Sequence, residues 1–573
     1  MLKNWIRTVF FLLVPIYGYC ELRPVNNNVT EPALVCSKKE SENLLIKGFN
    51  LQKDHNTEEA LVNYQKCLNL EPDCVSCLYE IGWSYWKQGS WEKVIDTWNK
   101  VLLLRPTHAQ VLEFLPTAKE NLKIIDSKNK IEVFRNKTNL MISSEPKDAP
   151  VSIVFVSRWQ AYNSKVVSPI DHFDLDIDSP KSASFSPDGK KVYVNSLEGS
   201  KTVVFDPFSF VKLAVIQHKF EGSETFIDKK APFDYEWPKV QNPNEFSGRP
   251  VESISSHNGK YLWVPYYRRS YDELGTSPSA IAIIDAESLK IIRVMGTGPI
   301  AKYVQVSSDG RYLAISHWGD NTVGLFDIRG NDPFKFKEIS KLVVGDVLTK
   351  KIMVGNRDKN CGFCVRGLSF SKDSRYLFVS RMSKGGIAVF DLEAQEEKSY
   401  LGTLFGIHPG PRDIQIDQSG EFLYSGCNAT GFIQKVRVKN VLEQFKNKPI
   451  GSSVIVKPED LNTKSVFAGT GVRSIKLTQD GKYLFAAINK ISELHVYDTR
   501  TMKRIAQIPV DSYPVGLALS PDGGQAWVTS QGNGHKGGNS VGVYQIQYHQ
   551  EEHISKTKYP QINFNETNVG KNK

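Results

Sequence analysis

A unit that recurs between residues of about 180 and 546 constrains the fold of this chain more than any other feature. Its clearest copy is residues 298–328, GPIAKYVQVSSDGRYLAISHWGDNTVGLFDI. The alternation of apolar and polar residues predicts half-buried β-strands, and the Asp-Gly pair between two such runs predicts a tight hairpin. Each copy is therefore expected to form a small antiparallel sheet.

Seven copies of the unit can be aligned on the glycine of this hairpin turn, or on the serine that replaces it once. The seven turn residues are Gly189, Gly259, Gly310, Ser374, Gly420, Gly481 and Gly523. Repeated four-stranded units of about 40–50 residues predict a β-propeller, because a single such sheet cannot cover its own faces and must stack radially on its neighbours. We expect seven blades over residues 151–548, with an early strand near residues 151–156 completing the last blade.

The best-preserved motifs of the repeat are Phe185-Ser-Pro-Asp-Gly189, followed by Val-Tyr-Val-Asn at 192–195, and Leu519-Ser-Pro-Asp-Gly523. They resemble the YVTN-type seven-bladed propellers, a family that also includes lactonase-like propellers such as 6-phosphogluconolactonases. Gly410-Pro-Arg412-Asp413 resembles the Gly-Pro-Arg-His segment of the lactonase type, in which the arginine lies in the proposed sugar-lactone site. Asp413 stands in place of that histidine. The resemblance implies Arg412, Asp413 and His408 as the catalytic candidates of a lactonase interpretation.

Residues 41–126 carry a different repeat, which is helical. Pro72 and Pro106 are separated by the tetratricopeptide period of about 34 residues. Small residues at 48 and 82 and large residues at 64 and 98 recur at this spacing. The segment resembles two tetratricopeptide repeats, at 41–74 and 75–108, followed by a capping helix. Such repeats imply a groove for protein partners. The charged residues 127–150 are expected to form a linker to the propeller.

Residues 1–20 combine a basic start with a short apolar run, as in a secretory signal peptide. Cleavage is expected near Cys20, and a lipid-anchored Cys20 is the alternative. No other stretch approaches the about 20 apolar residues of a membrane-spanning helix. We therefore expect an exported protein of the periplasm, outer envelope or cell surface. The polar tail at 549–573 is expected to be disordered.

The eight cysteines include two Cys-x-x-Cys pairs, at 74–77 and 361–364. Leu78 and Val365 follow these pairs where a c-type haem site requires histidine, so covalent haem is not expected. Because export permits disulfides, we expect short-range disulfides or buried thiols rather than a shared metal ion. The sequence suggests no cofactor and no metal site. The net charge of +10 permits an anionic partner, but no nucleic-acid-binding motif accompanies it.

Basic residues recur at one position of the repeat, eight residues before the turn residue. This position holds Lys181, Val251, Lys302, Arg366, Arg412, Arg473 and Val515 in the seven copies. Because rotation about one axis relates the blades, the five cations are expected to gather at the mouth of the central channel. They predict either an anion-binding funnel or a set of structural ion pairs, with Glu252, Asp413 and Asp511 as internal partners.

Long insertions at 217–250, 341–360 and 438–468 are expected to join the outer strand of one blade to the inner strand of the next, on the face of this mouth. The first contains several aromatic residues, which suit either a lid or a loop pinned to the propeller. The sequence as a whole favours a binding or scaffold protein over an enzyme. Its helical groove would bind proteins, and its channel mouth would bind a small anion or an acidic peptide. A hydrolase of sugar acid lactones is the alternative function.

Overall fold

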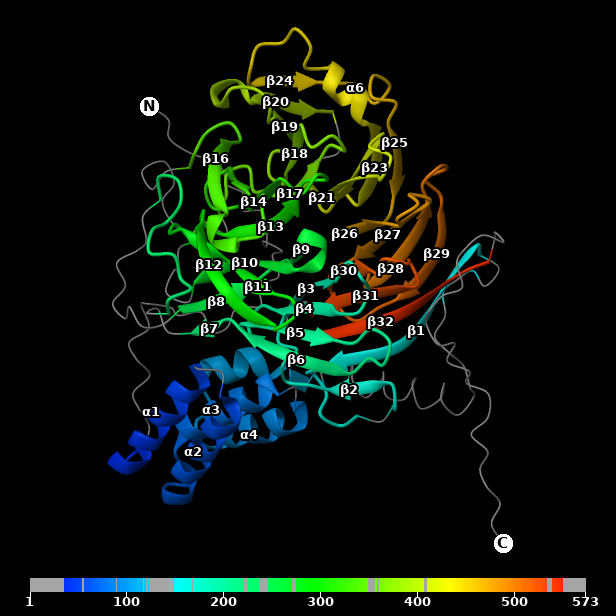
Figure 1. The fold of residues 1–573 in the computed structure, drawn as a ribbon. Coiled ribbons are helices and arrows are strands. Elements are labelled where there is room, and N and C mark those ends of the chain that lie inside the picture. Colours follow the sequence, from blue (N-terminus) through cyan, green and yellow to red (C-terminus); the bar gives the residue numbers. More distant parts are fainter. Residues whose placement is uncertain are drawn as a thin grey trace, which may run out of the picture.

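The computed structural model describes residues 36–549, except 54–55, 89, 117, 120–121, 123–143, 145, 147–148, 167, 221–223, 236–245, 270–274, 349–355, 358–359, 407–409 and 533–537. A small group of helices lies beside a ring of radially arranged sheets (Figure 1). This confirms the predicted fold class, a helical region followed by a seven-bladed β-propeller. The predicted signal peptide, Cys20 and the tail from residue 550 lie outside the described residues.

The helices form two hairpins that repeat the same close contact. They are α1 (Lys39–Lys53), α2 (Thr57–Leu70), α3 (Val75–Lys87) and α4 (Trp91–Leu104). A Cβ atom at Gly48 would overlap the ring of Tyr64, and one at Gly82 would overlap the indole of Trp98. Glycine lets the two helices of each hairpin approach closely. The offset between the two contacts equals the period read from the sequence.

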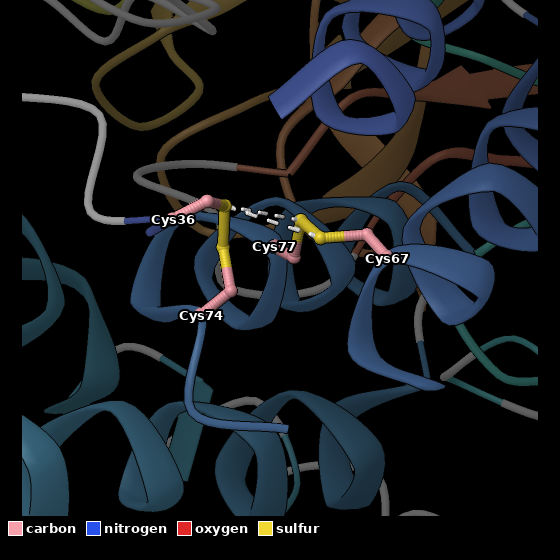
Figure 2. A group of neighbouring side chains, drawn as sticks. All are labelled: Cys36, Cys67, Cys74 and Cys77. Atoms are coloured by element: carbon pink, nitrogen blue, oxygen red, sulfur yellow. Dashed lines mark hydrogen bonds between the residues drawn. A yellow bond between two sulfur atoms is a disulfide. The ribbon is translucent and has the colours of Figure 1, made fainter. Parts of the chain in front are cut away.

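Two disulfides link the segment before α1 and helix α2 to the start of α3 (Figure 2). Cys36, just before α1, is bonded to Cys74, and Cys67 of α2 is bonded to Cys77 of α3. A third disulfide joins Cys361 to Cys364, whereas Cys427 is a buried thiol. The expectation of short-range disulfides is confirmed for Cys67–Cys77 and Cys361–Cys364, whereas Cys36–Cys74 spans a sequence separation of 38. Because the four clustered sulfur atoms are all in disulfides, none is a thiolate, which is the form that binds metals.

The seven blades each contain four strands running from the channel to the rim, with extra strands on the second, fourth and seventh. The first three are β3 (Pro180–Phe185), β4 (Val192–Ser196), β5 (Lys201–Phe205), β6 (Lys212–Gln217); β9 (Ile254–Ser256), β10 (Tyr261–Arg269), β11 (Ser279–Asp285), β12 (Lys290–Thr297), with β7 (Lys219–Phe220) and β8 (Phe246–Pro250) added; and β13 (Ala301–Val306), β14 (Tyr312–His317), β15 (Thr322–Asp327), β16 (Lys337–Val343).

The remaining four blades follow the same order. They are β17 (Val365–Phe370), β18 (Tyr376–Arg381), β19 (Ile387–Asp391), β20 (Tyr400–Phe405), with β24 (Ser452–Ile455) added; β21 (Pro411–Ile416), β22 (Phe422–Cys427), β23 (Phe432–Arg437), β25 (Lys464–Phe467); β26 (Val472–Leu477), β27 (Tyr483–Ile488), β28 (Glu493–Asp498), β29 (Arg504–Pro509); and β30 (Pro514–Leu519), β31 (Gln525–Ser530), β32 (Ser540–Tyr548), with β1 (Val151–Gln160) and β2 (Asp171–Phe173).

The hairpin turns confirm the alignment of the seven copies. All seven turn residues have a positive φ, including the non-glycine one, Ser374, at 61°. This left-handed conformation is the one that a tight turn requires and that glycine adopts without strain. The apolar cores lie between the blades, because the inner faces of adjacent sheets pack on each other.

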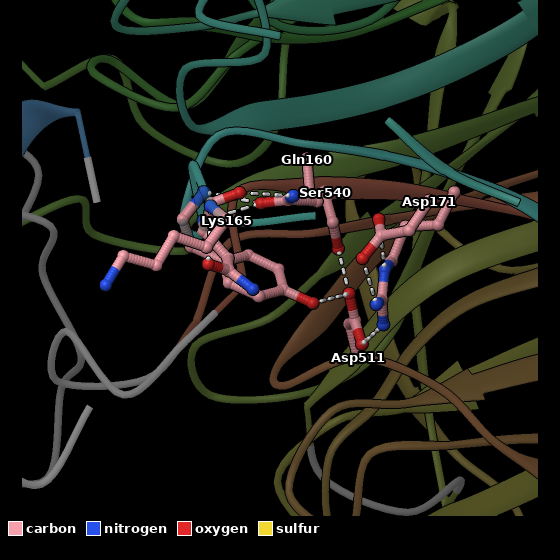
Figure 3. Close-up of polar contacts among 8 residues, drawn as sticks. Gln160, Lys165, Asp171, Asp511 and Ser540 are labelled. Atoms are coloured by element: carbon pink, nitrogen blue, oxygen red, sulfur yellow. Dashed lines mark hydrogen bonds and ion pairs between the residues drawn. The ribbon is translucent and has the colours of Figure 1, made fainter. Parts of the chain in front are cut away.

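The ring is closed by the first and last strands of the propeller, as the sequence predicted. β1 pairs antiparallel with β32, with Val151 opposite Tyr548 and Gln160 opposite Ser540. Figure 3 shows Asp171 and Asp511 beside this seam, where both carboxylates bind the buried guanidinium of Arg158. Asp511 is therefore a partner of Arg158 rather than of the channel cations. An N-terminal strand thus completes the last blade.

One predicted insertion lies elsewhere than expected. Residues 438–463 follow the third strand of the fifth blade rather than its fourth, and comprise the helix α6 (Val438–Glu443) and the added strand β24. β24 pairs parallel with β20 of the preceding blade, and only β25 completes the fifth blade. A connection between third and fourth strands leaves the sheet at the end opposite to that of the inner strand's start. This insertion therefore does not border the predicted mouth.

Candidate functional site

The channel cations sit on local irregularities of the inner strands. The pairing register between the first and second strands shifts at Lys181, Lys302, Arg412, Arg473 and Val515, and across Arg366 and Gly367. Such a shift is a β-bulge, which re-aims the side chain of the extra residue. The repeat position chosen from the sequence is thus a bulge in six blades, which gives these side chains a common direction.

An ion pair crosses the channel at this level. Arg366 of the fourth blade donates from Nη2 to Oε1 of Glu252, which precedes the inner strand of the second blade, at 2.8 Å. The third blade lies between these two in the ring, and its Tyr303 contributes a ring 5.4 Å from the Arg366 guanidinium. Glu252 was a predicted internal partner of the cations, and the structure confirms this pairing.

The five cations lie close enough to change one another's ionisation. Burial, together with Arg473, Arg412 and Arg366, holds the pKa of Lys181 well below its usual value. Burial and the nearby Lys181 and Arg412 do the same for the pKa of Lys302. The structure therefore brings the five predicted residues together.

The two arginines that complete this group are also affected by burial. Burial and Arg366 depress the pKa of Arg412, and burial lowers the pKa of Arg473 to about 10. Because the pKa of arginine starts above about 12, a guanidinium whose pKa is lowered to about 10 still carries its charge at neutral pH.

Several guanidinium nitrogens of this cluster have no hydrogen-bond partner among the described residues. They are Nε and Nη1 of Arg366, Nε of Arg412 and Nε of Arg473. Arg366 and Arg412 are buried, with 2% and 5% of their surface exposed. Nη1 of Arg412 donates to the sulfur of Met382 at 3.0 Å. A thioether sulfur is only a weak acceptor. A buried charged donor without a partner is costly, so these atoms define a place for acceptor oxygens.

A cavity of about 380 Å³, lined by both polar and apolar groups, continues the channel along the inner strands. Glu252, Asp413 and Tyr303 line this cavity, together with several serine, threonine and glutamine side chains. Burial raises the pKa of Glu252, although the Arg366 charge opposes this shift. The site thus combines five cations with two carboxylates, Glu252 and Asp413, at the end of a cavity that can hold a small molecule.

The catalytic candidates of the lactonase interpretation are only partly placed. Arg412 and Asp413 are consecutive residues of β21 at the channel, whereas His408 lies outside the described residues. Oδ2 of Asp413 accepts a hydrogen bond from the backbone N–H of Ile475 in the next blade, at 3.0 Å. Sequence reasoning missed Tyr303 and Lys476, which also line the cavity. Tyr303 stands one residue after the cation position of its repeat, where other copies hold Glu252 and Asp413, so the repeat could have located it.

The aromatic residues of the insertion at 217–250 pack on the propeller where the structure describes them. Phe233 contacts the ring of Phe326, with centroids 5.7 Å apart, and Tyr235 donates a hydrogen bond to Asp320 at 2.5 Å. These contacts pin the loop to the third blade rather than leaving it as a lid over the site. Trp237 lies outside the described residues.

Comparison with known families supports the propeller assignment. A family model described as "Lactonase, 7-bladed beta-propeller" matches residues 366–458, a stretch that includes Arg366, Arg412 and Asp413. Similar solved structures include the β-propeller domain of Myceliophteria thermophila Cps50 (Swd1), with 11% identity, 65% of this chain and 98% of that chain covered and a TM-score of 0.43. A chain of a mitotic checkpoint complex has 14% identity, 64% and 87% coverage and a TM-score of 0.42.

Kuenenia stuttgartiensis hydrazine synthase has 12% identity to this chain, with 67% of this chain and 100% of that chain covered and a TM-score of 0.43. At these identities the likenesses concern the fold alone. The ring of sheets is a seven-bladed propeller with a buried cationic cluster in its channel, and its residues 366–458 are similar to the lactonase family model. Within the described residues, no helix combines the length and apolar character needed to cross a membrane.

Proposed function

We propose that this protein is a binding protein whose propeller channel holds an anionic ligand or an acidic segment of a partner. The observation that carries the proposal is the set of buried guanidinium nitrogens of Arg366, Arg412 and Arg473 that lack acceptors among the described residues. The three arginines alone outnumber the two carboxylates, so an excess of positive charge remains that an anion would neutralise. Arginine suits this role because its planar donors can bind carboxylate or phosphate oxygens in pairs.

Calorimetric titration of the full chain with citrate and with inorganic phosphate tests the proposal. Arg412→Gln combined with Arg473→Gln is expected to weaken binding by about tenfold or more, since charged hydrogen bonds contribute about 1.5–3 kcal/mol each. The dependence of binding on salt should shrink as well. Arg329→Gln is the matched control, because that side chain is 67% exposed and pairs with Asp327 away from the channel. Failure of both anions to bind the native chain would refute the proposal.

A second candidate function is hydrolysis of a sugar acid lactone. The match of the lactonase family model to residues 366–458 favours it, because this stretch contains Arg412 and Asp413. Arg412 would stabilise the developing negative charge on the carbonyl oxygen, and Asp413 or His408 would activate water. Turnover of a sugar lactone by purified protein, abolished by Arg412→Ala, would establish this function. Absence of turnover with an intact anion site would leave the binding function alone.

The helical module is proposed to be a pair of tetratricopeptide repeats that bind a protein partner. The contacts of Gly48 with Tyr64 and of Gly82 with Trp98 support this, because they recur at the tetratricopeptide spacing. The protein is further proposed to be exported through residues 1–20, as a soluble protein or as a lipoprotein anchored at Cys20. Fractionation with lipid labelling tests the export. Cross-linking of the full chain and of a chain lacking residues 36–116 tests the partner.

A further inference from the structure

The carboxylate of Asp413 turns one oxygen toward the channel without a hydrogen-bond partner there. Asp413 is buried, with 2% of its surface exposed, and it lines the cavity. Its Oδ2 accepts from the backbone N–H of Ile475, whereas Oδ1 has no hydrogen-bond partner among the described residues. A buried acceptor in this position is expected to meet a donor, because leaving it unpaired is costly.

The hydroxyl of Tyr303 interacts with this carboxylate, and a hydrogen bond to Asp413 is among the causes of the raised pKa of Tyr303. Burial and the charges of Asp413 and Glu252 hold the pKa of Tyr303 well above its usual value, so the phenol keeps its proton. A carboxylate has about four lone-pair sites, and the Ile475 N–H and this phenol can fill only two of them. Asp413 therefore keeps room for a further donor even when Tyr303 turns toward it.

The side chains of Arg412 and Asp413 both lie at the channel, although the two residues are consecutive in sequence. In a regular strand, consecutive side chains point to opposite faces. The register shift between Pro411 and Asp413 breaks this alternation, so that Arg412 joins the cation cluster and Asp413 lines the cavity. The chain thus presents an unpaired donor, Nε of Arg412, and an unpaired acceptor, Oδ1 of Asp413, on successive residues.

The other carboxylate of the site is already engaged, since Oε1 of Glu252 accepts from Arg366 at 2.8 Å. Glu252 and Asp413 are neighbours, because the charge of Asp413 contributes to the raised pKa of Glu252. Asp413 is therefore the carboxylate with a spare acceptor, and it lies beside the ion pair that marks the cation level. A ligand held by the arginines would extend past this oxygen into the cavity.

We infer that the ligand of the channel carries a hydrogen-bond donor, a hydroxyl or an ammonium group, next to its anionic group, as in 2-hydroxy- or 2-amino-carboxylates. The anionic group would accept from the unpaired nitrogens of Arg366, Arg412 and Arg473, and the donor would bind Oδ1 of Asp413. This inference rests on the proposed anion-binding function and adds the chemistry of the ligand. The hydroxyl-rich cavity below accommodates a polar remainder of the molecule.

Three dicarboxylates of equal chain length provide the test. Succinate has no donor, malate has a hydroxyl group and aspartate has an ammonium group beside one carboxylate. Calorimetric titration of the full chain should show malate or aspartate binding about tenfold or more tightly than succinate, the effect of one hydrogen bond to a charged group. Preference for malate alone would assign a hydroxyl donor, and preference for aspartate alone would assign an ammonium donor.

Asp413→Asn is the decisive variant, because it preserves the shape of the side chain. Its amide oxygen can accept from Ile475 N–H, which places the NH₂ group where Oδ1 was. An ammonium group would then face a second donor, so the preference for aspartate over succinate should vanish while succinate itself still binds. A hydroxyl can accept as well as donate, so Asp413→Leu, which offers neither donor nor acceptor, tests the preference for malate. Glu287→Gln, at an exposed position on the second blade, is the control and should keep the preference.

The outcomes separate the two proposals. Equal binding of all three dicarboxylates by the native chain would overturn the inference about the donor and leave the anion site standing. A preference for aspartate that persists in Asp413→Asn, or a preference for malate that persists in Asp413→Leu, would also overturn it. Binding of none of the three would refute the anion site and with it the inference. Circular dichroism of the variant checks that loss of preference does not come from unfolding.

Discussion

The arrangement of the cationic side chains in the channel results from a one-residue β-bulge in each inner strand that carries one. Lys181, Lys302, Arg412 and Arg473 each occupy a register shift at the start of an inner strand. A bulge increases local twist and redirects one side chain without disturbing the rest of the sheet. Repetition of the same bulge around the ring concentrates charge at one level of the channel, where an isolated blade would merely carry one surface cation.

Protons should be taken up when an anion binds at this level. Burial and the neighbouring arginines hold the pKa of Lys181 well below its usual value, and a bound anion would raise it. Between the two values the complex holds more protons than the free protein, so affinity should fall as pH rises through that interval. Titration with citrate in buffers of different ionisation enthalpy measures the proton number.

Lys181→Met should reduce this proton uptake, and Lys503→Met, at an exposed position, should leave it unchanged. Citrate binding without proton uptake at any pH tested would show that the channel lysines remain charged in the free protein.

Removing the carboxylate that crosses the channel should have opposite effects on stability and on binding. Glu252→Gln would leave the buried Arg366 guanidinium without its charged partner, at a cost of about 3–5 kcal/mol in the free energy of unfolding. The same change increases the excess of positive charge, so citrate should bind more tightly. Denaturant unfolding and calorimetry measure the two effects.

Asp327→Asn is the control for this substitution, because its partner Arg329 is largely exposed and such pairs contribute about 1 kcal/mol or less. Weaker citrate binding by a folded Glu252→Gln protein would mean that Glu252 itself contacts the ligand.

At the scale of elements, the short helical module has a small apolar core, and disulfides contribute to its stability. Cys36–Cys74 joins the segment before α1 to the residue before α3, across a sequence separation of 38, whereas Cys361–Cys364 spans a separation of 3. A disulfide restricts the unfolded chain more when it closes a longer loop, although this entropic account depends on the model of the unfolded state.

Cys36→Ala with Cys74→Ala should therefore destabilise the helices by about 2–4 kcal/mol. Cys361→Ala with Cys364→Ala should cost less and should act on the propeller. Hydrogen exchange of peptides from the helices and from the propeller, measured by mass spectrometry at increasing denaturant, follows the two parts separately in both variants. Equal losses in the two variants would show that loop length does not govern the stabilisation.

The elements that the sequence could predict are those whose signal is local. The turn residues from Gly189 to Gly523 identify seven hairpins because each hairpin lies within one continuous stretch. The pairing of β24 with β20, which places Ser452 opposite Gly402, was not predicted. β24 lies in an insertion between two strands of the fifth blade, yet it pairs with a strand of the fourth. Likewise the positions of the channel cations follow from the repeat, whereas the Arg366–Glu252 pair depends on packing across two blades.

At the scale of the whole molecule, the helices and the propeller share a packed boundary. Tyr162, which follows β1, packs in the same apolar cluster as Trp91 and Trp98 of α4. The ammonium group of Lys165 binds the carboxylate of Glu92 beside this cluster. The strand that closes the ring therefore leads directly into the loop that contacts the helices, which couples closure of the propeller to docking of the helical module.

A half-buried carboxylate at this boundary, that of Asp178, should make stability depend on pH. Burial raises the pKa of Asp178 to about 6, against opposing effects of Lys87 of α3 and of Lys201 and Arg249, while Glu198 adds to the rise. In the unfolded chain the pKa is about 3.9. The folded protein therefore holds this proton more tightly, so the free energy of unfolding should fall as pH rises from about 4 through 6, by at most about 3 kcal/mol.

Asp178→Asn should remove this part of the pH dependence and stabilise the protein at neutral pH, because the neutral amide carries no cost of burying a charge. Urea unfolding of both proteins at several pH values between about 4 and 8 gives the comparison. Glu287→Gln should follow the native protein at every pH, since that side chain is exposed. If the stability of Asp178→Asn depended on pH as that of the native protein does, Lys87 would compensate the charge of Asp178. The attraction between helix α3 and the first blade would then hold the boundary together.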